Sequence, residues 1–309
     1  MRRPGRQRGV AVITAILIVA IATTIAVNML WRSQLDQRRT AAQLQADQAW
    51  LYLRGAEALA ADILRQDLLE FGPDSDHLGE IWAQRIDPLP VEGGFVTGEI
   101  EDLQGRFNLN NLLDPIGRAD PVAVEWFQRL LRVLELDPEL AWYVVDWLDV
   151  DTQPSFPVGA EDGAYTGREP PYRPPNLPVT STSELLAVEG FDADIYAQLR
   201  PFVAALPQGT TLNVNTAPAE VLASLDDGLG VASALQLIEQ RGDQDFPDYL
   251  TLFAPLVGET ILPRLGERSS HFRLSARAAI GSTQLTMYSL LFREANGVVR
   301  PLLRSLGTE

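Results

Sequence analysis

The chain has 309 residues and a formal net charge of -16, from 41 acidic against 25 basic residues, and every basic residue is Arg. Such an acidic chain is a poor general binder of nucleic acid, because contacts to phosphate need a basic face. The absence of Cys excludes disulfides, thiolate metal sites and Cys nucleophiles. Since there are only two His, a multi-His metal centre is excluded as well.

The N-terminal segment combines a basic flank with a long apolar run. Residues 1–9 contain four Arg and no acid, and residues 10–31 are apolar apart from three Thr and one Asn. The 22 residues of that run would span about 33 Å as a helix, enough for a bilayer core of about 30 Å. The basic flank predicts a cytoplasmic N-terminus, with the remaining chain across the membrane. We therefore expect residues 10–31 to be a transmembrane segment.

Three kinds of targeting segment fit this pattern to different degrees. A cleaved secretory signal is disfavoured, because residues 28–31 lack the small residues of a cleavage site. A plain signal anchor fits the apolar run. The basic leader that ends in Gly9, directly before the apolar residues from Val10, resembles the class III leader of type IV pilins and pseudopilins. That resemblance implies a leader of residues 1–9, cleavage by a prepilin peptidase between Gly9 and Val10, and N-methylation of Val10.

Thr14 departs from the usual pilin pattern. It stands at the fifth position after Gly9, where most pilins carry Glu. A carboxylate in hydrocarbon survives only with a partner, which in pilins is thought to be the N-terminal amine of a neighbouring subunit. The missing Glu is typical of the K minor pseudopilin, and an ordinary anchor would lack it too.

Helical spacing of apolar residues continues beyond the membrane segment. Phe71-Gly72-Pro73 then ends the pattern, which predicts one helix from Val10 to about Glu70. Residues 32–72 form its soluble half, which we expect to lie against a soluble domain. The apolar positions are Leu35, Ala42, Leu44, Ala49, Leu53, Ala56, Leu59, Ile63 and Leu64.

Two segments far apart in the chain show the alternation of β-strands. Residues 91–111 predict two short strands, the second near Arg106–Leu109, and residues 270–294 predict a hairpin with Gly281-Ser282 at its turn. One face of the first hairpin strand carries Phe272, Leu274, Ala276, Ala278 and Ile280. We expect an α+β fold in which the long helix packs on one antiparallel sheet, built from residues 73–112 and 269–309.

Residues 113–268, between the two halves of the sheet, predict an inserted α-helical domain. Helices are expected over residues 121–131 and 140–148. Two further stretches, near residues 183–202 and 219–240, have the form helix, Gly turn, helix and resemble helix-hairpin-helix units. Thr216 is predicted to cap the second unit. Acidic residues beside its turn disfavour DNA, and a packing unit for protein contacts is the simpler interpretation.

Several weak motifs occur in one order along the whole chain. After Gly9 and the apolar run come residues 102–110, 159–162, 183–185 and 212–216. The ordered set resembles the K minor pseudopilin family of type II secretion. The resemblance implies a pilin-like fold with a large helical insertion, at the tip of the pseudopilus in the inner membrane. It implies partnership with the minor pseudopilins I and J, which together start the filament. The major pseudopilin and secreted cargo are further possible partners, and nucleic acid is not expected.

An acidic loop is the candidate metal site. Carboxylates gather before and after a Pro- and Gly-rich stretch, and hard cations such as calcium prefer oxygen ligands. The family is similar to calcium-binding pseudopilins. No EF-hand spacing fixes individual ligands, and a solvated acidic loop is an equal alternative. The candidate ligands are Asp149, Asp151, Glu161 and Asp162, with Asp146 and Glu184 as further possibilities.

Catalysis has little support in the sequence. Nucleophile-elbow, P-loop and zincin motifs do not occur, and neither His77 nor His271 has a nucleophile at a recognisable spacing. We therefore predict a non-enzymatic tip subunit that starts assembly and supports protein export. The alternative is a signal-anchored periplasmic binding protein with helix-hairpin-helix modules, whose ligand is nucleic acid or protein.

Overall fold

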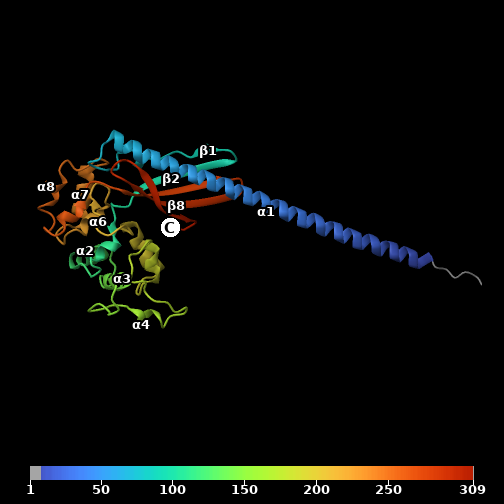
Figure 1. Cartoon of the computed structure of the whole chain (residues 1–309), viewed down its shortest axis with the longest axis horizontal. Coiled ribbons are helices and arrows are strands. Elements are labelled where there is room, and N and C mark those ends of the chain that lie inside the picture. Colours follow the sequence, from blue (N-terminus) through green and yellow to red (C-terminus); the bar gives the residue numbers. More distant parts are fainter. Residues whose placement is uncertain (1–7, 309) are drawn as a thin grey trace, which may run out of the picture.

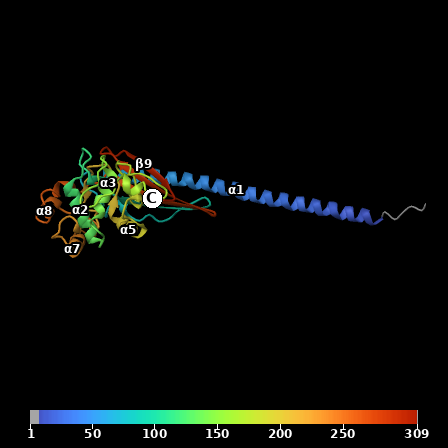
Figure 2. The ribbon, with the colours of Figure 1, turned by 90° about the horizontal axis from the view of Figure 1, so that it is seen from below.

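A rod and a head make up the computed structural model, which describes residues 8–308. The rod is α1 (Arg8–Glu70), a helix of 63 residues that matches the predicted span. Its first half projects from the head and its second half lies along a sheet, as two perpendicular views show (Figures 1 and 2). Residues 1–7 of the predicted leader lie outside the described residues.

The sheet under α1 has five antiparallel strands in the order β1-β2-β7-β8-β9. The strands are β1 (Leu89–Val91), β2 (Gly94–Asp102), β7 (His271–Ile280), β8 (Thr283–Arg293) and β9 (Val299–Leu306). Strand β2 pairs with β7 over its whole length, with Ile100 opposite Leu274. The predicted pairing of the two distant segments is thus confirmed, and residues 103–270 leave the sheet and return to it.

The α1 face of the sheet is the apolar face predicted from alternation. The five residues of β7 on that face are at most 2% exposed, and Met287 and Leu291 of β8 are fully buried. Opposite them, α1 buries one stripe of apolar residues, two Ala and two Leu. These residues are Ala49, Leu53, Ala60 and Leu64. Complementary stripes of this kind bring the helix and sheet together through burial of apolar area.

Two acidic residues interrupt the buried stripe of α1. Glu57 is 6% exposed and accepts hydrogen bonds from Arg304 of β9, at 2.6 and 2.9 Å, and from Ser289 of β8, at 2.8 Å. Burial raises the pKa of Glu57, but these hydrogen bonds outweigh it and hold the pKa below its usual value. Further along, Asp67 is 1% exposed and pairs with Arg293 of β8 at 3.0 Å. Each acid therefore meets one Arg of the sheet.

The insertion between β2 and β7 is helical and has its own core. Figure 1 shows it beside and below the sheet, away from the free half of α1. Phe107 stacks on Phe127 at 5.0 Å within this core, and Trp126 meets its edge at 5.1 Å. The α-helices are α2 (Pro121–Val133), α3 (Leu140–Leu148), α4 (Asp162–Tyr165), α5 (Ala193–Leu199), α6 (Ala219–Ala223), α7 (Val231–Arg241) and α8 (Tyr249–Phe253).

Short elements connect these helices and the sheet. The 3-10 helices are η1 (Ile81–Ala83), η2 (Leu109–Leu112), η3 (Thr182–Ala187), η4 (Arg200–Phe202) and η5 (Leu262–Arg264). Two small parallel ladders join β3 (Phe107–Asn108) to β4 (Val203–Ala204) and β5 (Leu212–Asn213) to β6 (Leu265–Gly266). The ladders connect parts of the insertion that are about a hundred residues or less apart in sequence.

The second strand expected near residues 106–109 is not part of the main sheet. It is β3, which pairs with β4, and Phe107 is 1% exposed in the core of the insertion. The chain turns away at Gly105, where an added Cβ would lie 2.7–2.9 Å from atoms of Thr216. This close approach of two segments carries the chain from the sheet into the insertion, which begins earlier than predicted.

Thr216 does not cap a helix, which corrects the sequence prediction. Helix α6 begins after Pro218, with no side-chain cap. The hydroxyl of Thr216 instead donates to Asp102 Oδ2 at 2.5 Å. The Asp102 carboxylate is only 8% exposed and needs such donors, because water does not replace them.

The two predicted helix-hairpin-helix stretches differ from each other in the structure. The first begins with η3, a 3-10 helix with a capping box between Ser181 and Glu184, and continues into α5. The second consists of the short α6, a turn at residues 228–230, and α7. Only the second unit therefore begins with an α-helix.

Asp102, at the end of β2, joins the sheet to the insertion. Its Oδ2 accepts from Thr216, from Ser269 Oγ at 2.6 Å and from Asn213 Nδ2 at 3.1 Å, and its Oδ1 accepts from Gln104 N at 2.7 Å. These donors come from both ends of the insertion. The Asp102 hub therefore ties the start of the insertion to its return.

We expect Asp102→Ala to lower the free energy of unfolding by about 3 kcal/mol, because four donors lose their acceptor in a buried site. Denaturant unfolding of the detergent-solubilised full chain measures the change. Asp87→Ala, at an exposed position, is the control, with an expected change within about 0.5 kcal/mol. Equal stabilities of the two variants would contradict the role of the hub.

Candidate functional site

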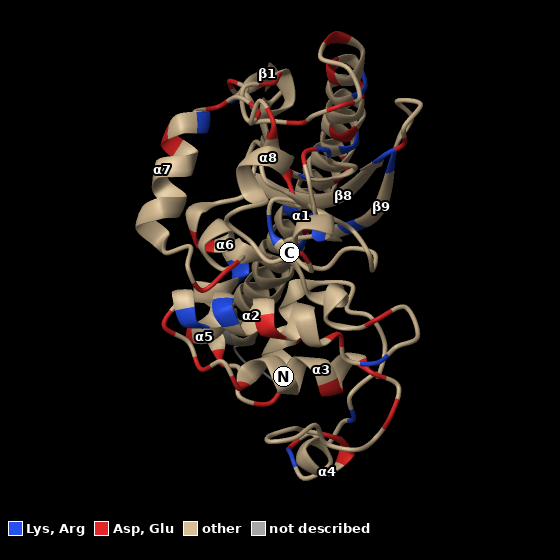
Figure 3. Ribbon diagram, turned by 90° about the vertical axis from the view of Figure 1, so that its left-hand side faces the viewer, with Lys and Arg blue, Asp and Glu red and all other residues tan. Residues whose placement is uncertain are grey.

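Three of the predicted metal ligands come together in the acidic loop after α3. Asp149 follows the last residue of α3, Asp151 lies two residues further, and Glu161 precedes α4. One carboxylate oxygen from each lies within 4.8 Å of the other two. Asp149 is 7% and Glu161 5% exposed, whereas Asp151 is exposed. In Figure 3 this loop lies at the end of the head opposite β1, next to α4.

The buried oxygens of this cluster lack partners within the described residues. Asp149 Oδ1 and both Glu161 carboxylate oxygens accept no hydrogen bond. Burial raises the pKa of Asp149 to about 7, and the charges of Asp151 and Asp146 add to the effect. Burial likewise raises the pKa of Glu161 to about 7, again with neighbouring carboxylates. These three buried oxygens thus have neither a hydrogen-bond donor nor a positive charge to pair with among the described residues.

Asp146 organises the loop from the last turn of α3. It is fully buried, and its carboxylate accepts from Ser155 N at 3.1 Å and from Ala160 N at 2.8 Å. Gly159 packs against it so closely that an added Cβ would lie 2.3 Å from Asp146 Oδ2. Asp146 therefore folds the loop so that Glu161 returns toward Asp149.

The other two predicted residues point elsewhere. Asp162 belongs to α4 and pairs with Arg173 at 3.3 Å. Glu184 completes the capping box of η3, where it accepts from Thr180 N at 2.7 Å. Neither belongs to the group of carboxylates formed by Asp149, Asp151 and Glu161.

Asn176 is a residue of this site that the sequence analysis missed. Its Nδ2 donates to the carbonyl oxygen of Asp151 at 2.7 Å, and its buried Oδ1 has no partner among the described residues. Asn176 has φ +50°, a left-handed conformation that Asn tolerates better than most residues. The adjacent Pro174-Pro175 could have marked a rigid turn, but nothing in the sequence pairs it with Asp151.

The donor set suits a hard cation. Carboxylate oxygens from three residues converge, and no sulfur or imidazole takes part in the cluster. The amide of Asn176 is joined to one of these residues through the Asp151 carbonyl. Calcium binds six to eight oxygens in flexible geometry, as acidic loops provide. A divalent cation would also neutralise the buried carboxylates.

A second feature is the free part of α1. Residues 10–34 are all exposed, and this helix is long and apolar enough to cross a membrane once. The hydroxyls of Thr14, Thr23 and Thr24 donate to backbone carbonyls one turn earlier, at 2.8–3.1 Å. Such internal hydrogen bonds satisfy polar groups where water is absent. The exposed segment is therefore compatible with a lipid environment.

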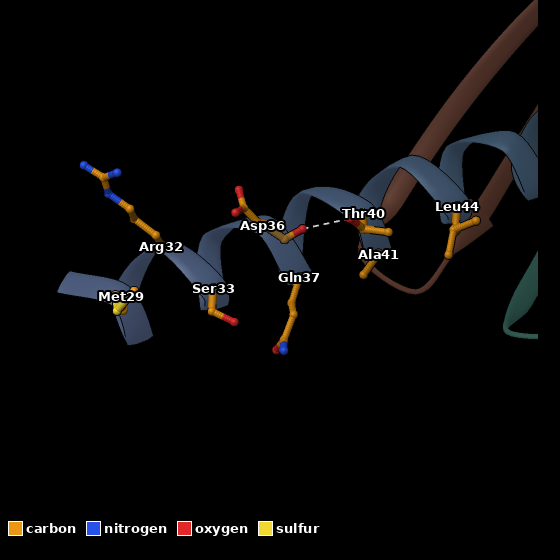
Figure 4. Close-up of a pocket in the computed structure, with 8 residues that line it drawn as sticks. All are labelled: Met29, Arg32, Ser33, Asp36, Gln37, Thr40, Ala41 and Leu44. Atoms are coloured by element: carbon orange, nitrogen blue, oxygen red, sulfur yellow. Dashed lines mark hydrogen bonds between the residues drawn. The ribbon is translucent and has the colours of Figure 1, made fainter. Parts of the chain in front are cut away.

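Beyond the apolar run, α1 has an exposed face of mixed character. Figure 4 shows Met29, Ser33, Gln37, Ala41 and other residues along this face, at spacings of three and four residues. The side chains lie outside the head, apart from the last of them near the sheet. This α1 face is available to another helix.

The second helix-Gly-helix stretch offers little to a phosphate. Arg241, the cation nearest its turn in the sequence, is 6% exposed and donates to the carbonyl of Val214 at 2.8 Å. At the turn itself, Asp226 accepts from Gly228 N at 2.9 Å. The hairpin thus presents a carboxylate where a phosphate-binding hairpin would present free amides.

Comparisons with known proteins agree on one family. Models described as "Type II secretion system (T2SS), protein K" match residues 105–208 and 212–259. Type II secretion system protein K of Pseudomonas aeruginosa is 36% identical, covering 97% of this chain and 93% of that protein. The chain belongs to the type II secretion system protein K family. The protein K of Aeromonas hydrophila is 35% identical, with 93% of both chains covered.

A solved structure extends this family match to the fold. A chain of the GspK–GspI–GspJ complex from enterotoxigenic Escherichia coli superposes with a TM-score of 0.79 and 29% identity. The match covers 88% of this chain and all of that one. The predicted family is confirmed, as is the combination of a long N-terminal helix with an antiparallel sheet.

The acidic cluster predicts how the stability of this family member depends on pH without metal. Because both pKa values are raised in the folded state, the folded chain holds extra protons, and stability falls as pH rises from about 4 through about 7. We expect Asp149→Asn to reduce this fall by about 3 kcal/mol in the presence of a chelator. Urea unfolding at a series of pH values measures the difference. Parallel pH profiles for the two proteins would contradict it.

Proposed function

We propose that this protein is a non-enzymatic minor pseudopilin at the tip of a type II secretion pseudopilus. The observation that carries the proposal is the match to a chain solved in complex with two other Gsp proteins, which covers 88% of this chain and all of the solved one. The family indicates a role in secretion. The projecting helix of the rod would allow the subunit to join the helical core of a filament. In this role it would start filament assembly with the minor pseudopilins I and J and support protein export.

Membrane insertion and processing follow from the same proposal. The basic residues 1–9 would keep the N-terminus in the cytoplasm, so the acidic head lies in the periplasm and residues 10–31 cross the inner membrane. A prepilin peptidase would cleave between Gly9 and Val10 and methylate Val10. The helix would then move from lipid into the filament.

The tip position has two structural supports. Thr14 is neutral, and its hydroxyl donates to backbone carbonyls within α1. It therefore needs no charged partner from a subunit placed closer to the filament tip. The insertion makes the head much wider than α1 and lies beside the sheet (Figure 1). A second subunit of this width stacked above would need to displace the first. The α1 face between Met29 and Leu44 remains free for the helices of I and J.

Co-purification tests the proposed assembly. The tagged full chain is expressed with the I and J pseudopilins of its own system and an active prepilin peptidase, and is extracted in detergent. We expect equimolar I and J with the tagged chain, whose intact mass has lost residues 1–9 and gained one methyl group. Gly9→Val is the control and should leave the leader in place. An uncut chain beside an active peptidase, or a chain without I and J, would contradict the proposal.

We further propose that the acidic loop binds calcium. Asp149, Asp151 and Glu161 would be ligands, and Asn176, whose Oδ1 is unpartnered and whose Nδ2 donates to the Asp151 carbonyl, is a further candidate. The unpartnered buried oxygens support this proposal, because an uncompensated cluster of this kind is costly. Calcium would hold the loop between α3 and α4 closed and so preserve the surface of the insertion.

Two neighbouring carboxylates offer a matched test of calcium binding. Calcium at about a hundred times its dissociation constant should stabilise the full chain by about 2.7 kcal/mol. Glu161→Gln should abolish this gain, whereas Asp162→Asn should keep it, because Asp162 pairs with Arg173. Thermal unfolding with calcium and with a chelator gives the gain. Terbium luminescence, sensitised by Trp147, reports binding directly. Equal responses of the two variants would rule out the proposed ligand set.

A further inference from the structure

A second cluster of acids is buried where α1 ends. Asp67 of α1 and Asp76 and Glu80 of the following loop are 1%, 4% and 0% exposed. One carboxylate oxygen of each lies within 4.8 Å of the others. Arg293 of β8 reaches into this group and is 5% exposed. The four side chains form the α1-end cluster.

Arg293 satisfies one part of the cluster. Its Nη1 donates to Asp67 Oδ2 at 3.0 Å and its Nη2 donates to Asp76 Oδ1, while Asp76 Oδ2 accepts from Ser269 N at 2.7 Å. The guanidinium also donates to the carbonyl oxygens of Leu64 and Ser269 and lies 4.8 Å from the centre of the Phe272 ring. Both oxygens of Asp76 are thus paired, and each terminal nitrogen of the guanidinium donates to two acceptors.

Two carboxylate oxygens in the cluster have no partner among the described residues. They are Asp67 Oδ1 and Glu80 Oε1. The other oxygen of Glu80 accepts from Trp82 Nε1 at 2.5 Å. Three carboxylates face one guanidinium, so the cluster would bury excess negative charge if every acid were ionised.

No other group among the described residues donates a hydrogen bond to Glu80 Oε1. His77 Nε2 is 3.7 Å from this oxygen, within ion-pair distance but beyond hydrogen-bond distance, and its Nδ1 lies 3.1 Å from the carbonyl oxygen of Asp243 and 3.2 Å from Gly79 N. Glu70, next to Asp67 on the last turn of α1, adds further negative charge. A metal ion bound by these carboxylates would lie against the guanidinium of Arg293 and would be repelled by its positive charge. A proton on one carboxylate removes negative charge without that repulsion.

We propose that Glu80 is protonated in the folded protein at neutral pH and that its carboxyl group donates a hydrogen bond to Asp67 Oδ1. One proton then satisfies both unpartnered oxygens and leaves Arg293 paired with Asp67 and Asp76, so that the excess negative charge of the cluster is halved. Burial raises the pKa of Glu80 to about 8, and the carboxylates of Asp67 and Asp76 raise it further, which agrees with this geometry. Loss of the proton would leave two carboxylates repelling each other in a dry site.

The proposed hydrogen bond between Glu80 and Asp67 helps to join three parts of the fold: the end of α1, the insertion and the start of β7. We call this hydrogen bond the latch. The backbone N of Asp76 donates to the carbonyl oxygen of Glu267 at 2.7 Å, and the carbonyl oxygen of Asp76 accepts from Asn213 at 3.0 Å. The loop that carries Glu80 thus connects the end of α1 with both the insertion and the start of β7. Deprotonation in alkaline conditions is expected to loosen the insertion against the sheet.

Glu80→Gln tests the latch, because its amide can donate to Asp67 as a carboxyl group does. The detergent-solubilised full chain is held in saturating calcium, so that the acidic loop keeps one state. Between about pH 7 and about pH 9.5, the Tm of the unaltered protein should fall by about 5 °C more than the Tm of Glu80→Gln. Glu259→Gln, at an exposed position, is the control and should follow the unaltered protein.

Infrared spectroscopy keeps the proposal testable if Glu80→Gln does not fold. The unaltered protein should show the carbonyl band of a buried protonated carboxyl group at about pH 7, and this band should disappear above about pH 9. Hydrogen exchange of residues 73–85 should speed up over the same pH range by more than the intrinsic base-catalysed rise. A Tm difference that does not change with pH, or a missing carboxyl band, would overturn the proposal.

Discussion

The fold depends on two ion pairs between acidic residues on the buried face of α1 and Arg residues of the sheet. Glu57 and Asp67 lie in the same stripe as apolar residues that pack on the sheet, and neither has access to bulk water. Each is met by an Arg from the sheet, Arg304 in β9 and Arg293 in β8. Sliding α1 along the sheet by one turn would bury both acids without partners, at a cost of several kcal/mol each. The two ion pairs therefore fix the register of the helix, whereas apolar contacts alone would tolerate more than one.

The insertion is a second consequence of sheet geometry. Because β2 pairs directly with β7, the intervening chain must leave and re-enter the sheet at nearly the same point. Closing a loop of this length is costly in entropy, although the cost grows only slowly with length. The Asp102 hub lies at this point and accepts hydrogen bonds from Gln104 at the start of the insertion and from Ser269 at its return. It also accepts from Asn213 and Thr216 in the middle of the insertion. A compact helical core in the insertion then keeps its ends together.

Much of this arrangement was predictable because it follows from local periodicity. Alternation over residues 270–294 predicted the buried face of β7, and apolar spacing predicted the length of α1. The sequence predictions were wrong where a residue contacts another residue that is distant in the sequence. Thr216 looks like a helix cap but donates to Asp102, and residues near Phe107 have a strand pattern but belong to the insertion. In the acidic loop, composition predicted the cluster, yet only the folded chain separates Glu161 from Asp162 and adds Asn176.

The buried carboxylates of this acidic protein have different kinds of partner, and the kind of partner differs between the regions of the fold. Arg pairs with Glu57, where a permanent charge suits a joint that must not move. Neutral donors surround Asp102, which needs a dense set of fixed partners at the junction of the insertion. At Asp149 and Glu161 the described residues supply no partner for three buried oxygens, which is why we propose a bound cation there, and at Glu80 we propose a proton. Under these proposals the permanent contacts lie along α1 and the sheet, while the regions that would respond to ions and pH lie in loops of the head.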